Sequence, residues 1–108
     1  MSRILKRLPA KQDLIEQADY IAQDNLEAAL RFLEAAEKTF AQLARLPQIG
    51  KSRKVKSKVF ANVRQFPITG FEKHLVFYRP IKGGIEVLRV LHSARDLNRI
   101  LEQEPLRS

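Results

Sequence analysis

The sequence contains no cysteine and no tryptophan, and it has only two histidines, His74 and His92. Without cysteine, neither a disulfide framework nor a thiolate metal site can form. No run of apolar residues approaches the roughly 20 that a membrane-spanning helix needs. The first eight residues alternate in character and lack the apolar block of a secretory signal. We therefore expect a cytoplasmic protein with no membrane segment and no metal site.

Acidic residues are missing from one long stretch of the chain. Residues 38–71 hold eight lysines and arginines and no aspartate or glutamate, whereas residues 9–37 hold seven acidic and two basic side chains. The whole chain carries a net charge of +8. Positive charge segregated in this way attracts a phosphate backbone or an acidic protein surface. A solvated face that only keeps the protein soluble would give the same pattern.

The first half of the chain has the spacing of two helices. Apolar residues recur every three or four positions over about residues 9–23 and again from Leu26 to about residue 46. Asp24, which stands three residues before Glu27, is expected to cap the second helix. Pro47 should end that helix. The pattern predicts a hairpin of two antiparallel helices joined by a tight turn.

Strand patterns occupy the rest of the chain. A short strand is expected at residues 3–8, and three more at about 58–66, 73–80 and 84–91. Residues 50–57 are read as a basic loop, and the Gly83-Gly84 pair predicts a hairpin turn between the last two strands.

The order of these elements predicts one α+β domain over residues 1–108. It reads β-α-α-β-β-β, with a helical hairpin packed on one antiparallel-rich sheet and a short C-terminal helix capped by Asp96. The last strand is apolar on both faces, but the two helices can cover only one. Either the sheet twists enough to hide the other face, or a partner covers it.

Few residues suit catalysis, and the best group lies where the last strand ends. It combines Arg89, His92, Ser93, Arg95 and Asp96, and Arg64 and Arg79 on neighbouring strands could join it. Metal-free RNA cleavage needs a base, an acid and cations that stabilise phosphate charge. The alternative is purely structural: Asp96 caps a helix, Arg89 pairs with a carboxylate, and His92 only ends a strand.

Several stretches resemble the ParE branch of the RelE/ParE toxin superfamily. They are Ala-Leu-Arg-Phe-Leu at 29–33, Leu-Pro-x-x-Gly-x-x-Arg at 46–53, Val-Arg-x-Phe-Pro at 63–67 with Leu-Val-Phe-Tyr-Arg at 75–79, and Ile-Glu-Val-Leu-Arg-Val-Leu-His-Ser-Ala-Arg-Asp at 85–96. The last stretch is the most specific. Together they span about residues 3–102, and their order and spacing carry the resemblance more than any one of them.

The resemblance implies a bacterial type II toxin that is neutralised by a ParD-like antitoxin whose C-terminal segment wraps it. ParE toxins are associated with plasmid stabilisation and with inhibition of DNA gyrase, whereas RelE-like relatives cleave mRNA on the ribosome. Those nucleases commonly place a tyrosine near the C-terminus, but here the last tyrosine is Tyr78. This departure favours a protein inhibitor of gyrase over an enzyme. The resemblance further implies no cofactor and an indirect association with DNA.

The resemblance and the charge pattern together suggest two sets of binding residues. Target contacts are expected at the strand end and the basic loop: Arg89, His92, Arg95, Lys51, Arg53 and Lys54. Antitoxin contacts are expected at apolar positions: Leu30, Leu33, Phe60, Phe66, Leu88 and Val90. Two alternatives stay open. One is an mRNA endonuclease that uses His92, Arg89, Arg95, Arg79 and Arg64, and the other is an inert basic binding module.

Overall fold

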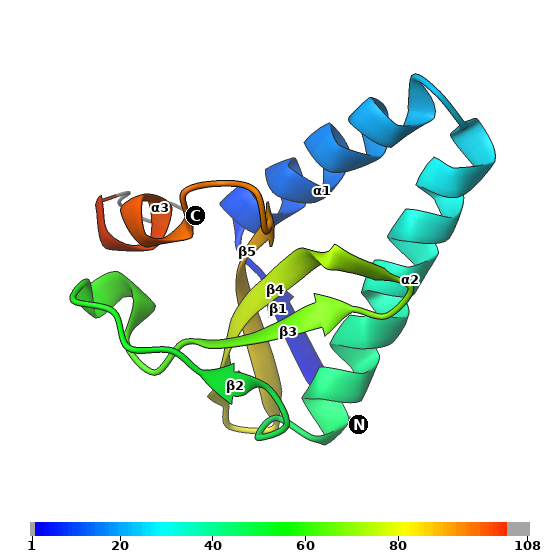
Figure 1. Cartoon of the computed structure of the whole chain (residues 1–108). Coiled ribbons are helices and arrows are strands. Elements are labelled where there is room, and N and C mark those ends of the chain that lie inside the picture. The colour runs from blue at the N-terminus through cyan, green and yellow to red at the C-terminus, as the bar shows by residue number, and fades with distance from the viewer. Residues whose placement is uncertain (1, 104–108) are drawn as a thin grey trace.

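A computed structural model describes residues 2–103 of the chain. Its five-stranded sheet has the order β1-β5-β4-β3-β2, with the hairpin of α1 and α2 on one face and α3 near the other (Figure 1). The α+β class predicted from the sequence is confirmed. The elements are β1 Arg3–Lys6, α1 Leu8–Ala22, α2 Leu26–Arg45, β2 Lys51–Ser52, the 3-10 turn η1 Lys58–Phe60, β3 Arg64–Ile68, β4 Phe71–Ile81, β5 Gly84–His92 and α3 Leu97–Gln103.

The sheet joins the two ends of the described chain. β1 runs parallel to β5, with Arg3 opposite Gly84, and every other neighbouring pair is antiparallel. A side chain at Gly84 would overlap the backbone of Arg3, so glycine is required for β1 to approach this closely. The predicted first strand is shorter than expected, because α1 already begins at Leu8 with Pro9 in its first turn.

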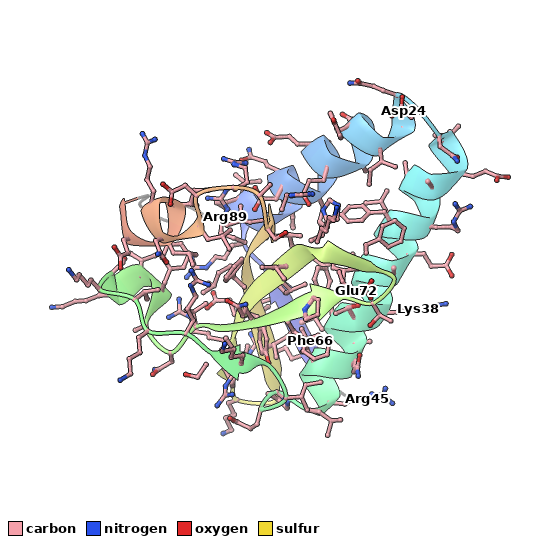
Figure 2. The ribbon with its side chains drawn as sticks, viewed as in Figure 1. Asp24, Lys38, Arg45, Phe66, Glu72 and Arg89 are labelled. Carbon is pink, nitrogen blue, oxygen red and sulfur yellow. The ribbon has the colours of Figure 1, made fainter. Side chains whose placement is uncertain are left out.

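The helical hairpin forms as predicted, but a different residue caps its second helix. Asn25 has an extended backbone, and its side chain accepts a hydrogen bond from the Ala28 amide at 3.0 Å. Asp24 instead stays in the turn that leaves α1, where its amide donates to the carbonyl of Ile21. The prediction of Asp24 as the cap was therefore wrong by one residue. Figure 2 shows Asp24 at the tip of the hairpin.

The strand predicted at 58–66 is the main error of the sequence reading. Residues 58–60 form the 3-10 turn, Asn62 has a left-handed backbone (φ 63°), and β3 begins only at Arg64. Pro67 lies inside β3 and does not end it. Proline is tolerated there because β2 pairs only with Arg64 and Gln65, so the remainder of β3 is an edge of the sheet.

Two apolar clusters fill the two sides of the sheet. The larger lies under the helical hairpin and includes Phe32, Phe40 and Tyr78. The smaller lies on the opposite face, where α3 and residues 55–63 cover β4 and β5; its buried members are Phe60, Val63, Phe77, Leu88, Leu91 and Leu101. The second face of β5 is thus covered by the chain itself. Neither strong twist nor a covering partner, the two alternatives expected from the sequence, is needed.

Candidate functional site

Arg89, expected at the interaction site, is buried in an ion pair. Its Nε and Nη2 atoms donate to the two carboxylate oxygens of Asp13 at 2.8 and 2.9 Å. Only 7% of Arg89 and 6% of Asp13 are exposed. Asp13 lies on α1, so the pair joins that helix to β5. The structural alternative for Arg89, pairing with a carboxylate, is what the structure shows.

The same face of α1 covers the edge of β5 beyond the end of β1. Asp13 also accepts the backbone amide of Val90 at 2.9 Å, and Gln17, one helical turn later, donates to the Val90 carbonyl at 2.7 Å. Two side chains thus satisfy the groups that a neighbouring strand would otherwise bond. Because an open strand edge invites pairing with other chains, this arrangement protects β5.

His92 lies against the second histidine, His74, at the same end of the sheet. The two residues are cross-strand partners, and their ring centroids are 5.0 Å apart. His74 Nδ1 donates to Gln17 Oε1 at 2.6 Å, and its ring packs on Phe32 at 4.7 Å. Burial, and secondarily the charge of His92, lowers the pKa of His74 below its ordinary value of 6.5. His92 Nδ1 accepts the Ala94 amide at 3.0 Å.

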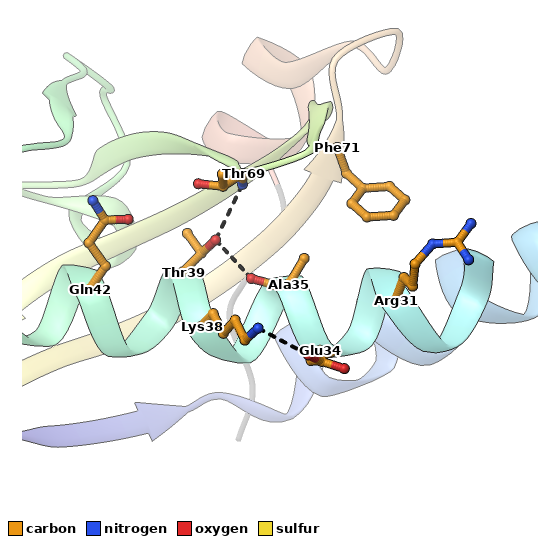
Figure 3. A pocket seen from close by; sticks show the side chains of 8 residues that line it. All are labelled: Arg31, Glu34, Ala35, Lys38, Thr39, Gln42, Thr69 and Phe71. Carbon is orange, nitrogen blue, oxygen red and sulfur yellow. Dashed lines mark hydrogen bonds and ion pairs between the residues drawn. The ribbon is translucent and has the colours of Figure 1, made fainter. Parts of the chain in front are cut away.

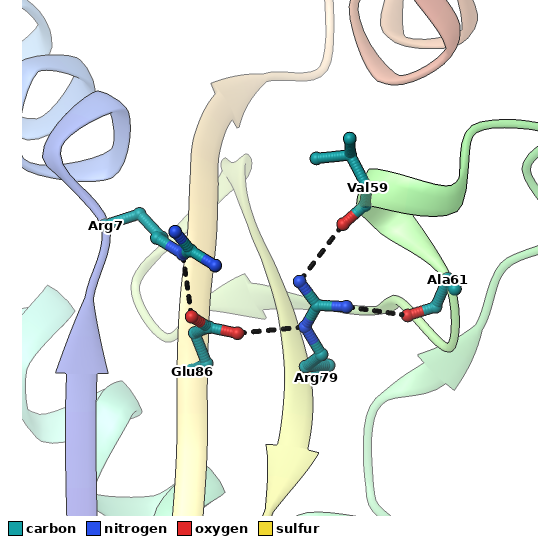
Figure 4. Close-up of polar contacts among 5 residues, drawn as sticks. All are labelled: Arg7, Val59, Ala61, Arg79 and Glu86. Atoms are coloured by element: carbon teal, nitrogen blue, oxygen red, sulfur yellow. Dashed lines mark hydrogen bonds and ion pairs between the residues drawn. The ribbon is translucent and has the colours of Figure 1, made fainter. Parts of the chain in front are cut away.

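Arg79 belongs to a different polar network, shown in Figure 4. Glu86 on β5 bridges Arg7 and Arg79, accepting from the Nε atom of each at 2.7 and 2.9 Å. Arg79 also donates to the carbonyls of Val59 and Ala61. Its guanidinium therefore fastens the segment around η1 to the sheet and does not join Arg89.

Arg64 holds the loop that follows α2. Its Nη1 donates to the carbonyls of Gly50 and Gln48 at 2.7 and 3.2 Å. The Tyr78 hydroxyl fastens the same loop, because it donates to the carbonyl of Pro47 at 2.8 Å and accepts the Gly50 amide at 2.9 Å. Burial raises the pKa of Tyr78 above its usual value. A side chain at residue 50 would overlap the Tyr78 ring, which explains the glycine.

From Arg53 onward, the basic loop alternates between half-buried and exposed side chains. Arg53 faces inward, where it donates to Gln65 Oε1 and Asn98 Oδ1, each at 2.7 Å. Lys51 and Lys54 are exposed, as is Arg95 after the end of β5. Of the six predicted target contacts, these three and the half-buried His92 present accessible side chains. Arg89 and Arg53 are engaged in contacts that hold the fold together.

A groove of about 460 Å³ runs along α2, beside the turn between β3 and β4. Figure 3 shows its lining side chains, which are Arg31, Glu34, Ala35, Lys38, Thr39, Gln42, Thr69 and Phe71. The floor includes Ala35 and the ring of Phe71, and cations stand at the rim. Thr39 bridges the two walls, because its hydroxyl donates to the Ala35 carbonyl at 2.8 Å and accepts the Thr69 amide at 3.3 Å.

The family assignment follows from the sequence as a whole. The family described as "ParE toxin of type II toxin-antitoxin system, parDE" matches residues 4–97. This range includes the helical hairpin, β2 to β5, and β1 from its second residue. The chain belongs to the ParE toxin family. It is accordingly a toxin of the type II class, a class in which the toxin is paired with an antitoxin.

A solved structure has the same fold. A chain described as "Chromosomal ParDE TA system from P. aeruginosa" superposes with a TM-score of 0.65 at 19% identity, covering 85% of this chain and 96% of that one. No curated protein matches the chain significantly in sequence. Among the helices of residues 2–103, none has the length and apolar character needed to cross a bilayer.

The six residues expected to bind an antitoxin differ in how exposed they are in this ParE-family chain. Phe60, Leu88 and Val90 are completely buried in the two cores. Leu33 and Phe66 are half-buried and pack against the larger cluster. Leu30 alone of the six is well exposed, at 58%. The accessible part of this set therefore lies on α2 and β3.

Sequence reasoning missed Asp13, Gln17 and Glu86, which hold the arginines and the strand edge in place. One signal for the first two was present in the sequence. Asp13 and Gln17 fall at the spacing of the apolar stripe of α1, where polar side chains face the sheet and need partners. Glu86 carried no such signal, because alternation on β5 predicts only that it faces away from the hairpin.

Proposed function

We propose that this ParE-family toxin acts as a non-enzymatic protein inhibitor of DNA gyrase and is held inactive by a ParD-like antitoxin. The observation that carries the proposal is the engagement of the arginines that a nuclease site would need. Arg89 is paired with Asp13, Arg79 with Glu86, and Arg64 with backbone carbonyls. Arginines that are already paired with carboxylates or bonded to backbone carbonyls contribute little to stabilising phosphate charge in a transition state.

The position of Tyr78 also supports binding over catalysis. Tyr78 is the last tyrosine in the sequence, and its hydroxyl is bonded to Pro47 and Gly50 inside the fold. A buried phenol that holds a loop has no access to an RNA backbone. This observation supports inhibition of gyrase over the ribosome-dependent cleavage of RelE-like relatives.

The test is a direct comparison of the two activities. Purified toxin should block supercoiling by gyrase and leave RNA intact, and its induction in cells should cause filamentation and a DNA-damage response. Supercoiling that continues at stoichiometric excess of toxin would contradict the proposal. RNA cleavage that is abolished in His92→Ala or Arg95→Ala would favour the endonuclease instead, because those two groups remain accessible.

We infer that the antitoxin occupies the groove along α2. The groove combines an apolar floor at Ala35 and Phe71 with basic side chains at Arg31 and Lys38, and the exposed Leu30 lies on the same helix. A segment with apolar anchors and acidic residues, which becomes ordered on binding, matches these features. The pairing of Arg31 with Glu27 and Lys38 with Glu34 at the surface is weak, so an incoming carboxylate can compete for either cation.

Neutralising the rim cations tests the location. Arg31→Gln/Lys38→Gln should weaken antitoxin binding by roughly fivefold, because two exposed charge pairs contribute about 1 kcal/mol in total, and the variant should stay toxic when the antitoxin is co-expressed. Lys11→Gln/Lys82→Gln removes the same charge from surfaces outside the groove and should be neutralised normally. Equal neutralisation of both variants would place the antitoxin elsewhere, without affecting the gyrase proposal.

A further inference from the structure

Five exposed cations lie on the two segments that cover the face of the sheet opposite the helical hairpin. Lys54, Lys56 and Lys58 come from the basic loop, and Arg95 and Arg99 from the segment that enters α3. We call these five residues the basic face. The loop and α3 lie side by side in Figure 1, and the contact of Arg53 with Asn98 joins them. Within residues 2–103, none of the five is in an ion pair with a carboxylate.

The lysines are presented by a strict alternation. From Arg53 to Val59, every second side chain turns inward and each intervening lysine is exposed. Val55 and Val59 pack on the smaller core, which fixes the direction of the lysines between them. The backbone bends at Lys56 and enters the 3-10 turn at Lys58. The three lysines therefore form a short row of cations without the regular spacing of a strand, and each can neutralise a phosphate of the same nucleic acid.

The segment is also fastened at both ends, so the charges are held in place before any partner arrives. Arg53 bonds Gln65 and Asn98 at the beginning of the row. Arg79 bonds the carbonyls of Val59 and Ala61 at its end. Preorganised charges bind with a smaller entropic cost than charges on a mobile loop.

The chemistry of the surface favours phosphate over a protein partner. Protein interfaces have an apolar centre, but the large exposed hydrophobic residues of the described chain lie elsewhere. They are Leu5, Leu8, Ile15, Tyr20, Leu26, Leu30, Leu46 and Ile49. The segments of the basic face carry five cations and two carboxylates, which are Asp96, engaged in capping α3 through the Arg99 amide, and Glu102 of α3.

We propose that the basic face binds the phosphate backbone of nucleic acid without reading its sequence. This inference goes beyond inhibition of gyrase and does not depend on it. The lysines neutralise phosphates along the row, and counterions released from the nucleic acid supply the favourable free energy. No base contact is involved, so affinity should be the same for unrelated sequences of equal length.

The experiment measures binding of the purified toxin to fluorescent duplex DNA by anisotropy, without gyrase or antitoxin. Affinity should fall at least a hundredfold between about 50 and 200 mM salt, as expected for several phosphate contacts. Lys54→Gln/Lys56→Gln/Lys58→Gln should reduce the slope of log affinity against log salt by about 3, one for each lost contact. Its affinity at low salt should fall by tenfold or more.

A matched variant separates the basic face from net charge. Lys11→Gln/Arg45→Gln/Lys82→Gln removes the same three charges from exposed positions on α1, α2 and the β4–β5 turn, and Figure 2 shows Arg45 at the far end of α2. It should keep the wild-type slope to within about 1. Equal losses in both triple variants would overturn the proposal, as would binding to polyglutamate as tight as binding to DNA. A duplex RNA probe, bound equally well, would support it.

Discussion

Arg89 lies where the last strand passes beyond the end of β1, so its neighbour on that side is a helix and not another strand. The helix supplies Asp13, and the same carboxylate bonds Arg89 and the Val90 amide. A buried charge is tolerated only when it is paired and hydrogen-bonded. One carboxylate therefore neutralises an arginine and protects a strand edge at the same time.

Removing that carboxylate should be costly. Asp13→Ala is expected to lower the free energy of unfolding by about 3–5 kcal/mol, because it leaves Arg89 charged and buried without its partner. Urea unfolding followed by circular dichroism measures the change. Glu16→Ala, at an exposed position of the same helix, should change stability by less than about 0.5 kcal/mol. Similar losses in the two variants would show that the pair contributes nothing special.

His74 should make stability depend on pH. Its pKa in the folded chain lies below 6.5, so the unfolded chain binds this proton more readily than the folded one. The stabilisation is complete above pH 6.5 and is lost as the pH falls below that value, through the folded pKa. Unfolding free energies at about pH 7.5 and pH 5 should differ more in the wild type than in His74→Gln. An equally steep dependence in the variant would refute the assignment.

At the scale of single residues, the sequence placed Arg89 near His92 but was wrong for Arg79. Arg79 lies opposite Glu86, whereas His92 lies opposite His74 at the other end of the β4–β5 ladder. The partner of Arg89 could not be predicted, because Asp13 is 76 residues away and a pairing over that distance depends on how the hairpin docks on the sheet. Lys51 and Lys54, expected as target contacts, are exposed, and their role stays a prediction.

Among the elements, η1 and α3 together cover the face of the sheet that lies opposite the helical hairpin. Neither segment is long, and each depends on the other: Phe60 comes from η1, Leu101 from α3, and both are completely buried. The covering of β5 is therefore a product of tertiary packing between two short segments.

Truncating Leu101 tests this dependence. Leu101→Ala should destabilise the protein by about 2–5 kcal/mol, the usual cost of a cavity at a buried leucine, and should increase the binding of a hydrophobic dye. Leu30→Ala makes the same chemical change at an exposed position of α2 and should alter stability by less than about 1 kcal/mol. A neutral Leu101→Ala would mean that α3 contributes little to the second core.

Helices and strands differed in how well the sequence predicted them. α1 and α2 repeat their apolar pattern over 15 and 20 residues, long enough for helical spacing to be unambiguous. Over residues 58–66, five of the nine residues are apolar, but Phe60 and Val63 face the same core from a turn and not from a strand. Alternation over so short a stretch cannot distinguish the two, so the strand was placed too early.

At the scale of the whole molecule, the sheet combines strands from both halves of the chain. Its edge strand β1 comes from the beginning, and β4 and β5 come from the second half. The sequence predicted that the first strand pairs non-locally, and β1 does so with β5. It could not give the direction of that pairing, because nothing in residues 3–6 distinguishes a parallel from an antiparallel neighbour. The acidic hairpin and the segments that carry the basic face lie on opposite sides of the sheet (Figure 1).

A shortened chain tests how far the two halves rely on each other. Residues 1–82 keep both helices of the hairpin but lose β5, and with it the partners of β1 and Asp13. This fragment should retain helical circular dichroism but show no cooperative unfolding transition, because the apolar stripe has nothing to pack against. A sharp transition in the fragment would show that the hairpin and β3–β4 form an independent unit.

The pairing of Arg3 with Gly84 also determines when the sheet can be completed during synthesis of the chain. A ribosome adds roughly 5–20 residues each second, so the N-terminal strand is made several seconds before the strand it pairs with. During that interval the helical hairpin can form from local contacts, but its apolar stripe has no sheet to cover it. The nascent chain therefore exposes apolar surface until residues 84–92 have been made and can pair with β1.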